Sequence, residues 1–248
     1  MSFCKDCISG VRHEGTQEGK METIGGVSCY VATPTVDYPT DKVIMFITDV
    51  FGIPLPNNPL LADDFARNGF KVVMPELFNG DAIPPDALEP GSTFDIQTWF
   101  GSHAPDGATE IVRKVIAALK EQGVTKFGSL GYCYGARVCF NLAFNNEVQA
   151  VAAAHPSLLK FPDDFEKYIA SSQAPLLINS CEFDTMFPLE NAPKVDGLFA
   201  SFGPGYKRTY YQGCTHGFAV RGDMSKPEIK AGKEGAFTES VKFMLEKL

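Results

Sequence analysis

The chain has 248 residues, of which 44% are hydrophobic, 12% aromatic and 21% charged, so it can bury a large core. This composition excludes intrinsic disorder, a fibrous repeat and a small disulfide scaffold. The formal net charge of −8 argues against nucleic acid and anionic membrane surfaces as partners, because both would repel it. No apolar run approaches bilayer-spanning length and the first residues lack a signal pattern, so we expect a cytoplasmic protein.

Seven cysteines, an odd number, are scattered along the chain. Without an export signal, this usage favours free thiols over a disulfide framework. Cys4 and Cys7, with His13 nearby, form one Cys-x-x-Cys pair without the second pair that a tetrahedral zinc site needs, so we expect no metal. Three others are expected to be inert core residues: Cys29, Cys139 and Cys181.

The chain alternates apolar runs with helical patterns. The runs read as strands, and several are continuous enough to be covered on both faces of a parallel sheet. The apolar runs span residues 43–48, 70–74, 148–154 and 175–180, and two further strands are predicted at 126–130 and 208–211. Helical spacing predicts three helices: one from the cap Asp106 to Gly123, one over 134–144, and a last one carrying Phe237, Val241, Met244 and Leu248. This alternation predicts a single doubly wound α/β domain.

Residues 79–103 break the alternation. The segment holds several prolines and the aromatic residues Phe94, Trp99 and Phe100, with no sustained period. We interpret it as a long surface excursion near a site. Its aromatic side chains either pack the excursion onto the body or line a pocket, and the sequence leaves both open.

The sharpest motif is Gly131-Tyr132-Cys133-Tyr134-Gly135, between the strand at 126–130 and the helix at 134–144. A Gly-x-nucleophile-x-Gly sequence in a strand–turn–helix context is typical of a nucleophile elbow. The glycines leave room beside the strained central residue, and the helix N-terminus favours the thiolate, which is the reactive form. Cys133 is therefore the candidate nucleophile.

Such a nucleophile needs a base and a group that orients the base. Asp184 follows the strand at 175–180 and His216 follows the strand at 208–211, so both leave the sheet at the same edge as Cys133. The order nucleophile, acid, histidine is that of α/β-hydrolases.

Other acids and histidines near these strands are weaker candidates. Glu182 competes with Asp184, but the acid usually follows its strand by a few residues, which favours Asp184. Asp196 lies in a helical segment and is expected to be solvated. His155 also ends a strand; we place it at the mouth of the site, with substrate contact as its less favoured role. His13 and His103 are expected at the surface.

These features together resemble the dienelactone hydrolase family. The resemblance is carried by the elbow, by Asp49-Val50-Phe51-Gly52 after the first strong strand, by the Asp184 loop and by His216-Gly217-Phe218, and it covers about residues 24–248. It implies an α/β-hydrolase fold over residues 1–248, with a mostly parallel sheet, helices on both faces, no separate cap domain and residues 1–23 as an N-terminal extension. It also implies a Cys133–Asp184–His216 triad and no cofactor.

The resemblance implies roles for neighbouring residues as well. Backbone N–H groups of Val50 and Tyr134 would form the oxyanion hole, a device that lowers a barrier by about 3 to 4 kcal/mol. The family commonly has Glu where this chain has the shorter Asp49, a carboxylate that interacts with the resting thiol. Bacterial members hold the substrate carboxylate with two arginines. Arg221 can take the second of these places, slightly displaced.

The first of the two arginines has no counterpart, because no arginine lies between Arg67 and Arg113. Phe94, Trp99 and Phe100 occupy that region, which favours a more apolar acyl or aromatic lactone substrate.

We therefore expect a carboxymethylenebutenolidase-like hydrolase that cleaves a lactone or carboxylic ester of a small organic acid through a thioester on Cys133. An acyl transferase or cyclase could use the same triad. A class I amidotransferase shares the elbow but carries His-x-Glu, whereas this chain has His216-Gly217-Phe218. A non-catalytic thiol redox or binding protein is the alternative from another class. The expected partner is a small-molecule substrate, and a homodimer stays open.

Overall fold

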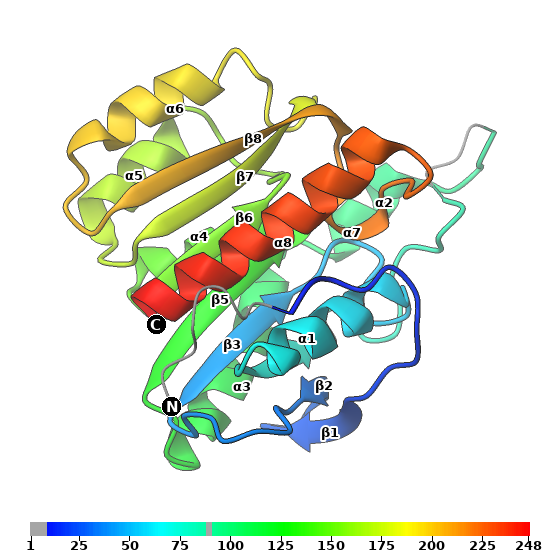
Figure 1. The fold of residues 1–248 in the computed structure, drawn as a ribbon, viewed down its shortest axis with the longest axis vertical. Coiled ribbons are helices and arrows are strands. Elements are labelled where there is room, and N and C mark those ends of the chain that lie inside the picture. The colour runs from blue at the N-terminus through cyan, green and yellow to red at the C-terminus, as the bar shows by residue number, and fades with distance from the viewer. Residues whose placement is uncertain (1–8, 88–90) are drawn as a thin grey trace.

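The computed structural model describes residues 9–87 and 91–248. Within these residues one eight-stranded sheet has the order β1-β2-β4-β3-β5-β6-β7-β8 (Figure 1). Its strands are β1 (Lys20–Ile24), β2 (Val27–Ala32), β3 (Lys42–Ile47), β4 (Lys71–Pro75), β5 (Lys126–Tyr132), β6 (Ala150–Ala154), β7 (Leu176–Phe183) and β8 (Tyr206–Thr215). From β4 to β8 every neighbouring pair is parallel, which confirms the predicted mostly parallel sheet.

All six predicted strands are present, with shifted ends. The shifts that bear on the site are at β7 and β8, which continue to Phe183 and Thr215. Asp184 and His216 are therefore the first residues beyond their strands. Because parallel strands end at one edge of a sheet, both residues emerge beside the end of β5.

The hairpin of β1 and β2 was not predicted, and it takes residues 20–23 out of the supposed extension and into the sheet. The two strands pair antiparallel, and β2 pairs antiparallel with β4. Most β1 side chains are exposed, so the strand lacks an apolar period. The available signal is Gly25-Gly26, which connects the strands with φ of 58° and 77°, as a tight hairpin turn requires.

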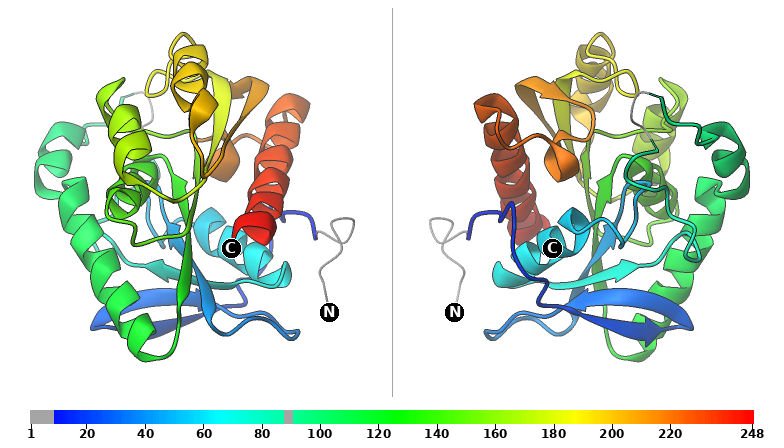
Figure 2. Two further views of the ribbon diagram at one scale, coloured as in Figure 1. Left: turned by 90° about the vertical axis from the view of Figure 1, so that its left-hand side faces the viewer. Right: turned by 90° about the vertical axis from the view of Figure 1, so that its right-hand side faces the viewer.

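Helices cover both faces of the sheet (Figure 2). One face carries α1 (Asn57–Arg67), α7 (Phe218–Arg221) and α8 (Pro227–Lys247); the other carries α3 (Pro105–Glu121), α4 (Tyr134–Phe144), α5 (Asp163–Ser171) and α6 (Ala192–Leu198). Alternate residues of β3 enter the two cores, with Val43 and Met45 on the α3–α4 side and Ile44 and Phe46 on the α1–α8 side. No helix in the described part of the chain is long and apolar enough to cross a membrane.

The predicted helices are present with corrected ends. α4 has the predicted bounds, and α8 begins well before the predicted apolar stripe. The prediction that Asp106 caps α3 is wrong, because Ala104 is the N-cap and Pro105 is the first helical residue. Asp106 lies in the first turn instead, where its charge suits the helix dipole and its carboxylate accepts a bond from Asn141.

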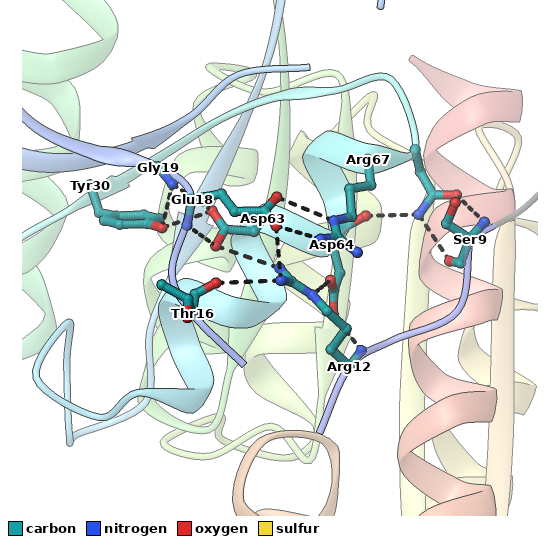
Figure 3. Close-up of polar contacts among 10 residues, drawn as sticks. Ser9, Arg12, Thr16, Glu18, Gly19, Tyr30, Asp63, Asp64 and Arg67 are labelled. Carbon is teal, nitrogen blue, oxygen red and sulfur yellow. Dashed lines mark hydrogen bonds and ion pairs between the residues drawn. The ribbon is translucent and has the colours of Figure 1, made fainter. Parts of the chain in front are cut away.

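The chain before β1 is tied to α1 by buried carboxylates (Figure 3). The backbone N–H and Nε of Arg12 each donate to Asp64 at 2.6 Å. Asp63 accepts bonds from the N–H of Glu18 at 2.8 Å and from the hydroxyl of Tyr30 at 2.7 Å. Both aspartates are buried. These bonds hold α1 in place, and its first turn reaches the site described next.

Candidate active site

Cys133 stands between β5 and α4 with φ of 50° and ψ of −111°, a strained conformation for a residue with a side chain. Its N–H donates to Ala154 O at 3.2 Å, which ties the turn to β6. A Cβ on Gly135 would lie 2.1 Å from Ile47 O, and one on Gly131 would lie 2.8 Å from the backbone of Ala136. The motif therefore has the strand–turn–helix geometry that its glycines predict, with Cys133 8% exposed.

Asp184 and His216 meet as the sequence predicts. The Nδ1 atom of His216 lies 2.9 Å from both carboxylate oxygens of Asp184. The N–H groups of Met186 and Phe187 also donate to Asp184 Oδ1, at 2.8 and 3.1 Å. The N–H of His216 donates to Phe183 O at 3.0 Å, so its loop is fixed to the end of β7. Asp184 can thus orient the imidazole and set its tautomer.

Two opposing influences set the charge of His216. Burial lowers the pKa of its imidazole, but hydrogen bonding to Asp184 and to Cys133 and the charges of both groups outweigh burial and raise the pKa to about 9. The thiol and the ring are therefore neighbours in the site.

The competing acids lie elsewhere. Glu182 accepts a bond from the N–H of Gly213 at 2.7 Å, across the β7–β8 pair. Asp196 lies in a helix as expected, and its side chain is 38% exposed, so it is solvated but also paired. It accepts bonds from Arg208 Nη2 at 2.6 Å and from the Tyr206 hydroxyl at 2.9 Å.

Asp49 is fully buried at the end of β3. Its Oδ1 accepts bonds from Asn58 Nδ2 at 3.1 Å and from the N–H of Phe51 at 3.2 Å. Its Oδ2 lies 3.7 Å from Arg221 Nε. Two of these partners, Asn58 and Arg221, lie on α1 and α7, and none of the three is the thiol. Burial raises the pKa of Asp49, against the lowering influence of Asn58 and Arg221.

Arg221 is held beside Asp49 by the anchoring of α7. The carbonyl oxygen of the preceding Val220 accepts bonds from Asn57 Nδ2 at 3.0 Å and from the buried Lys233 Nζ at 3.1 Å. The Arg221 guanidinium lies over the Phe51 ring, 5.1 Å from its centroid. Arg221 is thus next to the site, as its predicted position requires.

The two candidate oxyanion donors lie at the start of α4 and in the segment after β3. Tyr134 is the first residue of α4, so its N–H has no acceptor within the helix. Val50 is held by its carbonyl, which accepts a bond from the N–H of Ile83 at 3.0 Å. The Tyr134 hydroxyl donates to His103 O at 2.9 Å, which fixes the start of α4 to the excursion.

The excursion at 79–103 is more regular than predicted, because it contains α2 (Ile96–Ser102), capped by the Asp95 side chain. Trp99 is buried, donates from Nε1 to Asp81 O at 2.7 Å and packs edge-on against Tyr134. Trp99 therefore packs the excursion onto the body. Phe94 and Phe100 are partly buried against the same core. His103 stacks on Trp99 at 4.4 Å between ring centroids and is partly buried, so it is less exposed than the predicted surface position implies.

His155 is also misplaced by the sequence prediction. It is fully buried, with φ of 38°, and its ring centroid lies 5.0 Å from that of His216. Neither ring nitrogen has a hydrogen-bond partner among the described residues. Burial, helped by the charges of His216 and Arg221, lowers the pKa of His155 well below its usual range. His155 therefore lies behind His216 as a neutral ring and not at the mouth of the site.

Ser157 was missed. Its Oγ lies 3.4 Å from Cys133 Sγ, and its N–H donates to Cys133 O at 3.2 Å. The signal in the sequence was a polar residue just beyond a predicted strand, in the same segment as His155.

The other described cysteines are buried free thiols: Cys29, Cys139, Cys181 and Cys214. Burial raises the pKa of Cys29 and Cys139 to about 12 and that of Cys214 to about 11, which makes these thiols poor nucleophiles. Cys4 and Cys7 lie outside the described residues. The third member of that supposed metal group, His13, lies with Nε2 3.0 Å from Glu234.

The sequence model of the dienelactone hydrolase family matches residues 27–248 of this chain. The chain belongs to the dienelactone hydrolase family. Among its relatives is the hydrolase pyvD of Aspergillus violaceofuscus, 33% identical over 95% of this chain and 93% of the relative. This member of the family is a hydrolase of the dienelactone hydrolase type.

Solved structures agree on the fold. A Klebsiella pneumoniae protein, provisionally identified as a dienelactone hydrolase, superposes with a TM-score of 0.71 at 16% identity, covering 91% of this chain and 96% of that one. An α/β serine hydrolase homologue from Coxiella burnetii superposes with a TM-score of 0.58 at 16% identity, covering 95% of this chain and 99% of that one. The described residues of this family member thus have the predicted α/β-hydrolase fold without a separate cap.

Proposed function

We propose that the protein hydrolyses a lactone or carboxylic ester of a small organic acid through Cys133, with His216 as general base and Asp184 as its orienting acid. The observation that carries the proposal is the contact of His216 Nδ1 with both oxygens of Asp184 at 2.9 Å, beside a cysteine in an elbow. This contact leaves Nε2 as the nitrogen that can take the thiol proton.

The proposed reaction has two halves. His216 takes the proton of Cys133, and the thiolate attacks the carbonyl carbon while the N–H groups of Val50 and Tyr134 stabilise the oxyanion. The C–O bond breaks, and the imidazolium protonates the leaving alcohol, which in a lactone stays attached to the acyl group. Water, deprotonated by His216, then attacks the thioester and releases the acid and the thiol. No metal or organic cofactor is required.

Exposed apolar side chains beside the catalytic acid support an apolar substrate. Phe183 is 61% exposed and Met186 is 43% exposed, on either side of Asp184. With Trp99 packed into the core, these two residues are better candidates than the aromatic excursion for contact with an apolar acyl group. The five described free thiols support a reducing, cytoplasmic location.

The first test is hydrolysis by Cys133→Ala, with Cys139→Ala as the matched control because both thiols belong to the same turn and helix. We expect Cys133→Ala to lose at least about 10³-fold in kcat, and Cys139→Ala to stay within about threefold of the native chain. Intact-mass measurement should find an acyl adduct in the native chain and none in Cys133→Ala. Hydrolysis retained by Cys133→Ala would overturn the mechanism.

Product analysis then separates hydrolysis from acyl transfer. With an activated ester and a competing alcohol, the proposal predicts mainly free acid. Mainly transesterified or cyclised product would identify an acyl transferase or cyclase on the same triad. An acyl adduct on no cysteine would favour a redox or binding protein.

A further inference from the structure

The loop that follows β6 also contacts Cys133, although none of its residues belongs to the proposed triad. Ser157 is 3% exposed, with its Oγ 3.4 Å from Cys133 Sγ and its N–H bonded to Cys133 O. Two residues of this loop, His155 and Leu158, have positive φ of 38° and 60° without being glycine. Such conformations persist only where the surroundings enforce them, so the loop is held in the shape that delivers Ser157 to the sulfur.

A hydroxyl is a suitable partner for a sulfur atom that changes charge. It can accept a bond from the S–H of a thiol, and after rotation about its C–O bond it can donate to a thiolate. An ionised carboxylate can only accept, and its charge opposes thiolate formation. Asp49 Oδ1 accepts its hydrogen bonds from Asn58 and Phe51, and Ser157 places a neutral hydroxyl next to the sulfur, in addition to the His216 ring.

We propose that Ser157 is the hydrogen-bond partner of the Cys133 sulfur in both of its charge states, and that it readies the thiol for attack in the free protein, before substrate binds. The catalytic part of this inference rests on the proposed function. The proton of the thiol passes to Nε2 of His216, while Ser157 keeps its own proton and only reverses the direction of its hydrogen bond. No oxidant, metal or co-reactant takes part.

The charged and titratable groups around the thiol and the His216 ring come from four loops and one short helix. They are His216 with Asp184 behind it, Asp49 after β3, His155 after β6 and Arg221 on α7. Removing the Ser157 hydroxyl changes none of these groups. A shift in the titration of the thiol on its removal can therefore be assigned to the lost hydrogen bond.

The experiment is the rate of Cys133 alkylation by iodoacetamide against pH, without substrate, read by peptide mass spectrometry. We expect Ser157→Ala to alkylate about tenfold more slowly at pH 7, with the midpoint of its pH profile moved to higher pH, since a hydrogen bond to a charged group is lost. Ser172→Ala is the matched control, because Ser172 is also a buried serine, and its hydroxyl accepts a bond from the N–H of Ala174 and not from the thiol. Its profile should equal that of the native chain.

A second pair of variants keeps shape constant and also guards against failed folding. Ser157→Thr retains the hydroxyl and Ser157→Val has the same shape without it. Threonine should alkylate faster than valine by about the same tenfold ratio. An unchanged midpoint in Ser157→Ala, a faster reaction, or equal rates for threonine and valine would each overturn the proposal.

The outcome is separable from that of the proposed function, because alkylation needs no substrate. If the native chain cleaves no ester but Ser157→Ala still shifts the alkylation profile, the proposed function fails and the role of Ser157 stands. If the native chain cleaves esters and the profile does not shift, the role of Ser157 fails alone.

Discussion

Two buried carboxylates at the same edge of the sheet have opposite environments. Asp184, after β7, accepts two backbone N–H bonds and faces His216 with both oxygens. Asp49, after β3, accepts one N–H bond and one amide bond, and its Oδ2 has no hydrogen-bond partner among the described residues. Its cationic neighbour Arg221 is 3.7 Å away.

The difference shows how the contacts of a buried carboxylate determine what it can do. The N–H groups of Met186 and Phe187 fix the position of the Asp184 carboxylate, so it can hold the His216 ring in one orientation. For Asp49, burial is the larger influence and raises its pKa. Asp49 is therefore a buried acid whose charge depends on its surroundings, although the family likeness implies that it touches the thiol.

The largest expected effect tests the first half of this comparison. Asp184→Asn should lower kcat by about 10⁴-fold, because an amide cannot hold the required tautomer or stabilise the imidazolium. The pH profile of kcat/KM should also move, since the pKa of His216, raised to about 9, loses a main cause of that rise. Steady-state kinetics on one ester, with Asp196→Asn as the control, measures both. A loss below tenfold would remove Asp184 from the triad.

Asp49→Asn tests the part of the comparison that concerns Asp49, and its expected effect is smaller. We expect kcat/KM to fall by about tenfold, because Asp49 holds Asn58, Arg221 and the N–H of Phe51 in place and acts on the reaction through these contacts. The same kinetic assay measures it. A loss comparable with that of Asp184→Asn would contradict this difference between the two acids and indicate that Asp49 takes part in proton transfer.

The pH dependence of stability sharpens the comparison without any substrate. Since the pKa of Asp49 is raised on folding above its ordinary 3.8, the folded state binds the proton more tightly than the unfolded state does. The stability that this preference contributes is present below 3.8 and is lost as pH rises toward the folded pKa. Denaturant unfolding of Asp49→Asn and of the native chain between about pH 4 and pH 8 measures it. The stability of Asp49→Asn relative to the native chain should rise with pH, and a falling difference would contradict the burial of an ionisable Asp49.

The smallest effect is expected at Cys181, whose Sγ lies 3.8 Å from Asp184 Oδ2. A thiol is a weak donor, and Asp184 keeps its bonds from Met186 and Phe187 without it. Cys181→Ala should therefore keep kcat within about threefold of native. A larger loss, in a variant with native thermal unfolding, would show that the N–H groups alone do not hold Asp184.

The fold was largely predictable where local pattern and tertiary structure agree. α4 has its predicted bounds because the elbow glycines set its start and mostly apolar residues fill its length. Asp184 was predictable as a strand-end residue, because the apolar run before it marks a parallel strand, and His216 was predictable from its place after the predicted strand at 208–211. The errors fell on elements without such patterns: β1 has exposed side chains, and α2 is a single capped helix of seven residues in a proline-rich segment.

By itself the sequence determined the parallel α/β fold, the strained turn at Cys133 and the chain order of nucleophile, acid and histidine, because periodicity and glycine sterics act between near neighbours along the chain. Only the tertiary structure decided which groups surround them. Ser157 meets the sulfur, Asn58 and Arg221 meet Asp49, and His155 lies behind His216. Each of these contacts joins loops from different strands, so it depends on how the sheet and its helices pack, which no local pattern encodes.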